Sequence, residues 1–346
     1  MRTFECDYTE GVHPILLDAL TKTNLEQMSG YGSDPYTARA IEKIKAACGA
    51  PGATVTLLVG GTQTNVIAID LLLAPFEGVI APSTGHINVH EAGAVEFTGH
   101  KVLALSGHDG VQDVDALAAY LETFYADATH EHMVRPGLVY LTHPTEYGTL
   151  YTKAQMTRVR ALCDAYGMKL YVDGARLGYA LGCPENELTL PDLAALCDAF
   201  SIGGTKLGAL LGEALVFTRE APQHLLSQIK RHGGLLAKGR ALGVQFDALF
   251  TDGLYERIGR EAIRHANRIR AILERKGYPF AWASPTNQQF VILSDAEAEK
   301  LLSIVGFDLW GRRDAGHWIA RFTSSWSTTD EAVDELDRIL PDKTDL

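Results

Sequence analysis

The chain has 346 residues, of which 46% are hydrophobic and 21% charged, a composition typical of globular proteins with more than one small core. A net charge of −12 argues against nucleic acid and anionic membrane surfaces as partners. No apolar run is long enough to span a bilayer, no secretory signal is visible, and the five cysteines include no Cys-x-x-Cys pair. We therefore expect a reduced cytoplasmic protein with no metal site.

Strand and helix signals alternate along residues 55–217. This alternation predicts an α/β fold with an open, mainly parallel sheet flanked by helices, in which ligands collect at the carboxyl ends of the strands. Helices are expected near 66–73 and 153–165. Strands are expected at 55–59, 78–81, 102–105, 138–142, 169–172, 199–202 and 214–217.

The last hundred residues show a different pattern. A long amphipathic helix is expected over about 255–276 and ends at a glycine followed by a proline two residues later. Strands at 290–293 and 319–323 and a helix at 330–340 complete a small α+β unit. We expect a large domain over 18–250 and a small domain built from 1–17 and 251–346.

Two strand ends in the large domain carry side chains suited to pyridoxal phosphate (PLP) chemistry. Tyr171-Val172-Asp173-Gly174-Ala175-Arg176 is an apolar strand that ends in a carboxylate, and Lys206 follows a second apolar strand about thirty residues later. An Asp can pair with the protonated pyridine nitrogen, and a Lys can hold the aldehyde of PLP. Either residue alone is more often a cap or a surface charge, so their order and spacing carry the prediction.

A glycine-rich turn precedes these two residues. Gly60-Gly61-Thr62 follows a strand and opens a helix, where free backbone N–H groups and the helix dipole favour a phosphate group. Many such turns use glycine for geometry alone. The segment lacks the Gly-Lys-Ser/Thr of a P-loop and the G-x-G-x-x-G dinucleotide fingerprint, which argues against a nucleotide-dependent oxidoreductase.

Three further side chains are candidates for the site. His86 directly follows a strand, where its ring can stack on a pyridine and move a proton, although most loop histidines only contact water. His130-Glu131-His132 resembles a metal motif superficially, but alternate residues rarely converge on one ion. Arg321 lies between apolar neighbours and requires a carboxylate partner, either a substrate or an internal acid.

Together these motifs resemble the L-threonine aldolase and aromatic amino acid β-eliminating lyase family of fold-type I PLP enzymes, over nearly the whole chain. The Asp173-Gly174-Ala175-Arg176 segment carries the most specific resemblance, and Lys206 falls at the family's Schiff-base lysine. The remaining matches are Tyr31 near the cofactor at a subunit interface, Gly61 and Thr62 at the phosphate, His86 stacked on PLP, His132 as a second histidine, and Arg321 at the substrate carboxylate.

The resemblance implies a PLP-dependent aldolase that cleaves a β-hydroxy-α-amino acid of the threonine or allo-threonine type to glycine and an aldehyde. Its site would form between the subunits of a homodimer or homotetramer. Arg176 would tune the phenolic oxygen of the ring, and His86 or His132 would take the β-hydroxyl proton. A β-eliminating lyase that releases ammonia and a keto acid is the nearest alternative, and a catalytically silent binding protein is a more distant one.

The chain departs from the family pattern around the substrate. Residues 142–147 read Thr-His-Pro-Thr-Glu-Tyr where Glu-Asn-Thr-His is common, and Leu207 follows the lysine where glycine is usual. An arginine that helps hold the phosphate is missing from residues 233–238, so Arg231 or Lys238 is the expected substitute. Cys6 stands where a serine near the substrate carboxylate is usual. Cofactor use is therefore a firmer prediction than substrate identity.

Overall fold

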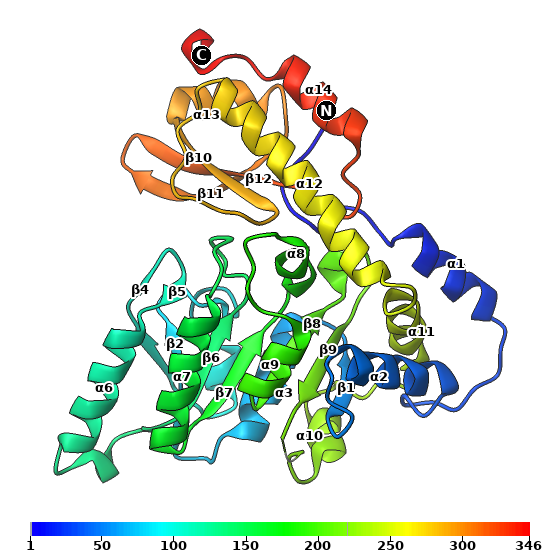
Figure 1. Ribbon diagram of the computed structural model, residues 1–346, viewed down its shortest axis with the longest axis vertical. Coiled ribbons are helices and arrows are strands. Elements are labelled where there is room, and N and C mark those ends of the chain that lie inside the picture. Colours follow the sequence, from blue (N-terminus) through cyan, green and yellow to red (C-terminus); the bar gives the residue numbers. More distant parts are fainter. Residues whose placement is uncertain (1, 220) are drawn as a thin grey trace.

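A seven-stranded sheet forms the centre of the computed structural model, which describes residues 2–219 and 221–346 (Figure 1). Its order is β1-β9-β8-β7-β6-β2-β3. The strands are β1 (Thr54–Leu58), β2 (Glu77–Pro82), β3 (Val102–Leu105), β6 (Arg135–Thr142), β7 (Lys169–Asp173), β8 (Ala199–Gly203) and β9 (Glu213–Phe217).

The direction of strand β9 sets the geometry of one side of the sheet. Strands β3, β2, β6, β7 and β8 run parallel, whereas β9 pairs antiparallel with both β8 and β1. The first residue of β9, Glu213, therefore lies in register with Leu58 and Gly203, near the ends of its two neighbours. A residue that starts β9 thus reaches the same edge as the carboxyl ends of the parallel strands.

Helices cover both faces of this sheet, so its strands are apolar on both sides. Helix α3 contributes Ile67 and Ile69 to one core, and α7 contributes Met156 and Val159 to the other. The helices of the large part are α2 (Pro35–Ala47), α3 (Gly61–Leu72), α4 (His86–Val89), α5 (Ala94–Phe97), α6 (Val114–Ala126), α7 (Lys153–Tyr166), α8 (Leu177–Gly182), α9 (Leu190–Leu196), α10 (Leu225–Arg231) and α11 (Arg240–Leu249). Short elements between them are β4 (Gly107–His108), β5 (Val111–Gln112), η1 (His130–His132) and η2 (Thr205–Leu207).

A smaller unit follows, built on the antiparallel sheet β10-β12-β11. Its elements are β10 (Gln288–Ser294), α13 (Asp295–Leu302), β11 (Asp308–Asp314), β12 (His317–Thr323), α14 (Asp330–Ile339) and η3 (Lys343–Asp345). Helix α12 (Leu254–Arg275) joins the two parts, because Ile258 packs in the large core and Ile269 in the small one. Figure 1 shows α12 crossing from the small sheet down to α8 and α11.

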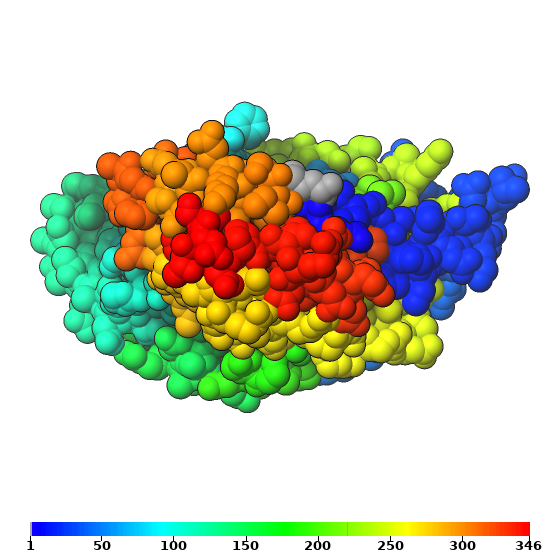
Figure 2. Space-filling model, turned by 90° about the horizontal axis from the view of Figure 1, so that it is seen from above, coloured from blue at the N-terminus to red at the C-terminus, as the bar shows by residue number. Residues whose placement is uncertain are grey.

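The N-terminal residues divide between the two parts. Phe4 donates its N–H to the Gly306 carbonyl at 2.7 Å and accepts from the Thr323 N–H at 2.8 Å, so the first residues pack on the small unit. Helix α1 (Pro14–Thr23) packs instead beside α11 and projects at one end of the molecule (Figure 2). It crosses the predicted boundary at residue 17, and the domain division itself stays a prediction.

The predicted α/β fold is confirmed, and most predicted strands agree with the observed ones to within one to three residues. Strand β11 was not predicted, because bulges at Leu309/Gly311 and Arg312/Asp314 interrupt its alternation. Among the described residues, every helix is too short or too polar to cross a bilayer.

Candidate active site

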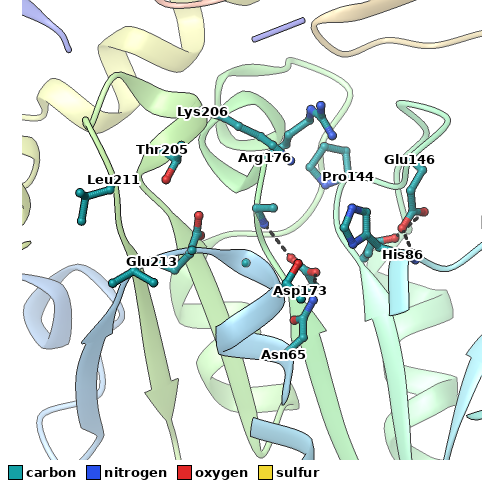
Figure 3. Close-up of a pocket in the computed structure, with 16 residues that line it drawn as sticks. Asn65, His86, Pro144, Glu146, Asp173, Arg176, Thr205, Lys206, Leu211 and Glu213 are labelled. Atoms are coloured by element: carbon teal, nitrogen blue, oxygen red, sulfur yellow. Dashed lines mark hydrogen bonds between the residues drawn. The ribbon is translucent and has the colours of Figure 1, made fainter. Parts of the chain in front are cut away.

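A cavity of about 300 Å³ lies at the carboxyl ends of the parallel strands, beneath the small unit. Figure 3 shows Asn65 and Asp173 at its floor, His86 and Glu146 on one side, Thr205 and Glu213 on the opposite side, and Lys206 and Arg176 above. Such a position is where open α/β sheets bind their ligands. The predicted residues Gly61, Thr62, His86, Asp173, Arg176 and Lys206 all line this one cavity.

The amino end of α3 fits a phosphate group. Gly60 caps the helix in an extended conformation, and within the described residues no side-chain cap hydrogen bond forms at this end. A Cβ atom built at Gly60 or Gly61 would meet no atom within 4 Å, so open space lies in front of these donors. Free N–H groups at the positive end of a helix dipole are suited to bind an anion.

The carboxylate of Asp173 is buried and held by three donors. Its Oδ2 accepts hydrogen bonds from Asn65 Nδ2 and from the Tyr140 hydroxyl, each at 2.8 Å, and its Oδ1 accepts from the Ala175 N–H at 2.9 Å. Burial, with the charge of Asp173 as a second cause, raises the pKa of Tyr140 well above its usual value, so this hydroxyl stays a donor. A fixed carboxylate at this depth fits the protonated nitrogen of a pyridine ring.

His86 is oriented by two carboxylates. Its Nδ1 lies 2.8 Å from Glu91 Oε1, and its backbone N–H donates to Glu146 Oε1 at 2.7 Å. Asn65 Nδ2 donates to the same Glu91 oxygen at 2.7 Å, which links the histidine to Asp173 through one amide group. Burial lowers the pKa of His86, but the Glu91 hydrogen bond and the charges of Asp173 and Glu91 outweigh it, so that pKa is raised.

Lys206 lies in η2, directly after strand β8. Tyr179 donates its hydroxyl to the Lys206 carbonyl and fixes the backbone at this point. Burial is the largest cause that lowers the pKa of Lys206, and the charge of Arg176 lowers it further, against the opposing carboxylates of Asp7 and Asp173. A lysine with a lowered pKa is more readily deprotonated, and only the neutral amine is nucleophilic.

The guanidinium of Arg176 is bound by an acid from the N-terminal segment. Arg176 Nε and Nη2 donate to the two oxygens of Asp7 at 2.7 and 3.0 Å, and Asn287 Nδ2 donates to the same carboxylate at 3.0 Å. Asp7 was not predicted, although a buried partner is expected for an arginine this deep. The role predicted for Arg176 at the phenolic oxygen stays a prediction.

Arg321 lies on β12, outside the set of residues that line the cavity. Its guanidinium donates to Gln288 Oε1 at 2.8 Å and lies 2.8 Å from Asp308 Oδ2, while its buried Nε has no partner among the described residues. The internal acid left open as an alternative is therefore present. Burial, followed by the charge of Arg176, lowers the pKa of Arg321, which places the two cations in each other's field.

Besides Arg321, four predicted residues lie away from the cavity of their own chain. His132 is exposed on η1, ahead of the eight-residue strand β6, about 25 Å from the strand's carboxyl end at 3.3 Å per residue. This placement contradicts a catalytic role for His132 there. Tyr31 and Lys238 are exposed on a shared surface, where Tyr31 N–H donates to the Ala237 carbonyl. Cys6 is half-buried in a separate hollow beside Ser325.

Sequence reasoning also missed cavity residues that carry acids. Glu146 and Glu213 line the cavity, and burial raises the pKa of each carboxyl group. Their signal is weak, because a lone acid beside a strand is usually a solvated residue. Arg231, one expected substitute for the missing arginine, is instead bound to Asp70 at 3.0 Å.

The fold and the cavity define the class of fold-type I PLP enzymes. A Thermus thermophilus aspartate aminotransferase variant shares the fold with a TM-score of 0.69 at 17% identity, covering 98% of this chain and 91% of that one. The model of the β-eliminating lyase family matches residues 7–322, and the chain belongs to this family. Its members are PLP-dependent.

Two relatives are similar over their full lengths. The low specificity L-threonine aldolase of Pseudomonas sp. (strain NCIMB 10558) is 29% identical over 340 residues, covering 96% of this chain and 95% of that one. The structure of the Leishmania major threonine aldolase is 39% identical with a TM-score of 0.93, covering 98% of both chains. The predicted threonine aldolase-like membership is confirmed.

Proposed function

We propose that this chain is a PLP-dependent aldolase that cleaves L-threonine or L-allo-threonine type amino acids to glycine and an aldehyde. The observation that carries the proposal is the convergence of Asp173, Lys206, His86 and the open amino end of α3 on one cavity. Full-length similarity to two threonine aldolases supports the same activity.

The predicted residues that line the cavity have separate tasks in this reaction. Lys206 would attach the cofactor, Asp173 would hold its ring nitrogen, and Gly61 and Thr62 would bind its phosphate. When bound, PLP supplies an electron sink for the pair that remains on Cα. His86 lies on the opposite side of the cavity from Glu213, where its ring can accept the β-hydroxyl proton while Glu91 holds Nδ1.

Arg321 would bind the substrate carboxylate, and Arg176 would assist it in addition to the role predicted for Arg176 at the phenolic oxygen. The buried Nε of Arg321 has no partner among the described residues, and an unpaired buried donor is costly. Arg176 lines the cavity and its charge acts on Arg321, although Asp7 already occupies one edge of the Arg176 guanidinium. A substrate carboxylate that reaches this pair would fix Cα above the floor of the cavity.

We also infer a homodimer or homotetramer. Tyr31 is 53% exposed, Leu210 54% and Leu226 61%, and large apolar side chains on a surface favour association. Tyr31 and Lys238 lie outside the cavity of their own chain, so their predicted cofactor contacts require a second copy. Light scattering after gel filtration measures the state, and a monomer with full activity would contradict this inference.

Product analysis tests the activity. The L and D forms of threonine and allo-threonine, with phenylserine, serine and cysteine, are incubated with the protein and PLP. Glycine plus an aldehyde establishes the aldolase, and the isomers consumed give its stereochemistry. Ammonia plus a keto acid without glycine would instead establish the β-eliminating lyase that the family description names.

A further inference from the structure

Glu213 is a buried acid to which the proposed reaction gives no role. It is only 3% exposed, and it lines the cavity together with Gly60, Gly61 and Thr205. The antiparallel direction of β9 brings it to this edge, in register with Leu58, two residues before the α3 cap. Figure 3 shows its carboxyl group directed toward Thr205, on the side of the cavity opposite His86 and Glu146.

The surroundings of Glu213 favour a neutral carboxyl group. Burial raises its pKa well above the usual value; the charge of Lys206 opposes this effect, and the charge of Asp173 adds to it. Its Oε2 is buried without a hydrogen-bond partner among the described residues. An isolated carboxylate is costly in such a place, whereas a protonated carboxyl group has an O–H donor that requires an acceptor.

The charge at the α3 end of the cavity indicates which acceptor is suitable. The groups that gather there are the α3 N–H donors, the Thr205 hydroxyl and Glu213. Among the described residues that line the cavity, the Lys and Arg side chains are Lys206 and Arg176, which lie above its floor. Arg231 is bound to Asp70, and Lys238 is exposed elsewhere. An ionised Glu213 would repel an anion at this position, whereas a neutral one would bind it.

We propose that Glu213 is a cofactor-binding residue whose protonated carboxyl group donates a hydrogen bond to the phosphate held at the amino end of α3. The inference rests on the PLP site of the proposed function. Glu213 thereby replaces the missing phosphate-binding arginine with a neutral donor. The ligand is a phosphate monoester, and the chain should bind PLP more tightly than pyridoxal, which has the same ring without the phosphate.

The test compares holoenzymes of the wild type, Glu213→Gln and Glu213→Ala, with Glu122→Gln on the exposed face of α6 as a control. Each holoenzyme is exchanged against PLP or against pyridoxal, and cofactor retention is measured by absorbance. Glu213→Ala should weaken PLP retention about tenfold or more, the usual effect of losing a hydrogen bond to a charged group, and should leave pyridoxal retention unchanged. Glu213→Gln keeps a neutral donor and should stay within about threefold of the wild type.

Infrared spectroscopy reads the proton directly. The difference spectrum between the wild-type and Glu213→Gln holoenzymes should contain the carbonyl band of a protonated carboxylic acid. Melting temperatures identify a variant that fails to fold, and if Glu213→Ala does so, the difference spectrum with the folded Glu213→Gln holoenzyme still decides the proton assignment. Free inorganic phosphate serves as a second probe: it should compete with PLP and not with pyridoxal, and failure to compete with PLP would contradict a phosphate position at the amino end of α3.

Three outcomes overturn the inference. Glu213→Ala could retain PLP as the wild type does, or the difference spectrum between wild type and Glu213→Gln could lack the carbonyl band. Alternatively, both variants could shift the pH dependence of cofactor absorbance without affecting retention, which would make Glu213 a proton partner of Lys206. If the wild type forms glycine and both Glu213 variants retain PLP as the wild type does, only this inference is refuted. If the wild type never binds PLP, the proposed function is refuted as well.

Discussion

Asp173 and Arg176 are three residues apart, yet they belong to two differently built sides of one cavity. Asp173 is held by Asn65, Tyr140 and its own following turn, all within the large sheet and its helix α3. Arg176 is held by Asp7, which the small unit positions through Asn287. The contacts that hold Asp173, on the cofactor side, therefore all lie within the large part of the chain, whereas those that hold Arg176, on the substrate side, depend on the contact between the two parts.

The largest effect is expected from removing the lysine that would attach the cofactor. Lys206→Ala eliminates the nucleophile that would attach PLP and should lower glycine release at least about a thousandfold. Borohydride reduction followed by peptide mass spectrometry should find the cofactor on Lys206 in the wild type and nowhere in the variant. Lys101→Ala, on an exposed surface, is the control. Substantial turnover by Lys206→Ala would refute the assignment.

The next variant keeps the cofactor side but removes its charge. Asp173→Asn presents an amide to the donors of Asn65 and Tyr140, so one donor faces another and the negative charge is lost. We expect kcat to fall about a hundredfold, as when a preorganised electrostatic contact is removed. Tyr140→Phe removes one donor and leaves the charge, so a smaller loss is expected. Equal losses in the two variants would show that hydrogen bonding, not charge, determines the rate.

The substrate side should respond in binding rather than in turnover. Arg321→Ala removes the guanidinium whose Nε has no partner, and should raise KM about ten- to a hundredfold with kcat less affected. Arg313→Ala, exposed on the neighbouring strand, is the matched control. Steady-state kinetics measures both, and an unchanged KM would place the carboxylate site elsewhere.

Sequence patterns predicted the cofactor side better than the substrate side, for a topological reason. The carboxyl ends of parallel strands meet at one edge, so Asp173, Lys206 and His86 could be grouped from their places after strands. Glu213 escaped this reasoning, because it begins a strand whose antiparallel direction no local pattern reveals. His132 was misplaced for the complementary reason, since it precedes strand β6 rather than following it.

The substrate side also combines segments that lie far apart in the chain. Asp7 and Arg176 are 169 residues apart, and Asp7 and Asn287 are 280 residues apart. Neither pairing leaves a periodic signal, because each depends on how the small unit packs over the sheet. The carboxylate partner of Arg321 was accordingly left open between a substrate and an internal acid, and Asp308 shows that the internal acid is available.

The smallest expected effect is a shift in the pH dependence of kcat. Below its pKa His86 is protonated and cannot accept the β-hydroxyl proton, so activity should rise as pH rises through that pKa. Glu91→Gln keeps a hydrogen-bonding oxygen but removes the negative charge that helps raise the pKa of His86, so the acidic limb of kcat should move to lower pH. Glu96→Gln, exposed five residues later, should leave the limb in place.

Stability gives an independent readout of the same change. Because the folded state raises the pKa of His86 above 6.5, the pair contributes stability that is fully present below that value and is lost as pH rises through the folded pKa. Glu91→Gln should therefore lower the melting temperature more at about pH 5.5 than at about pH 8.5. A uniform loss across pH would mean that Glu91 positions Asn65 and the floor of the cavity, and that another group controls the proton on His86.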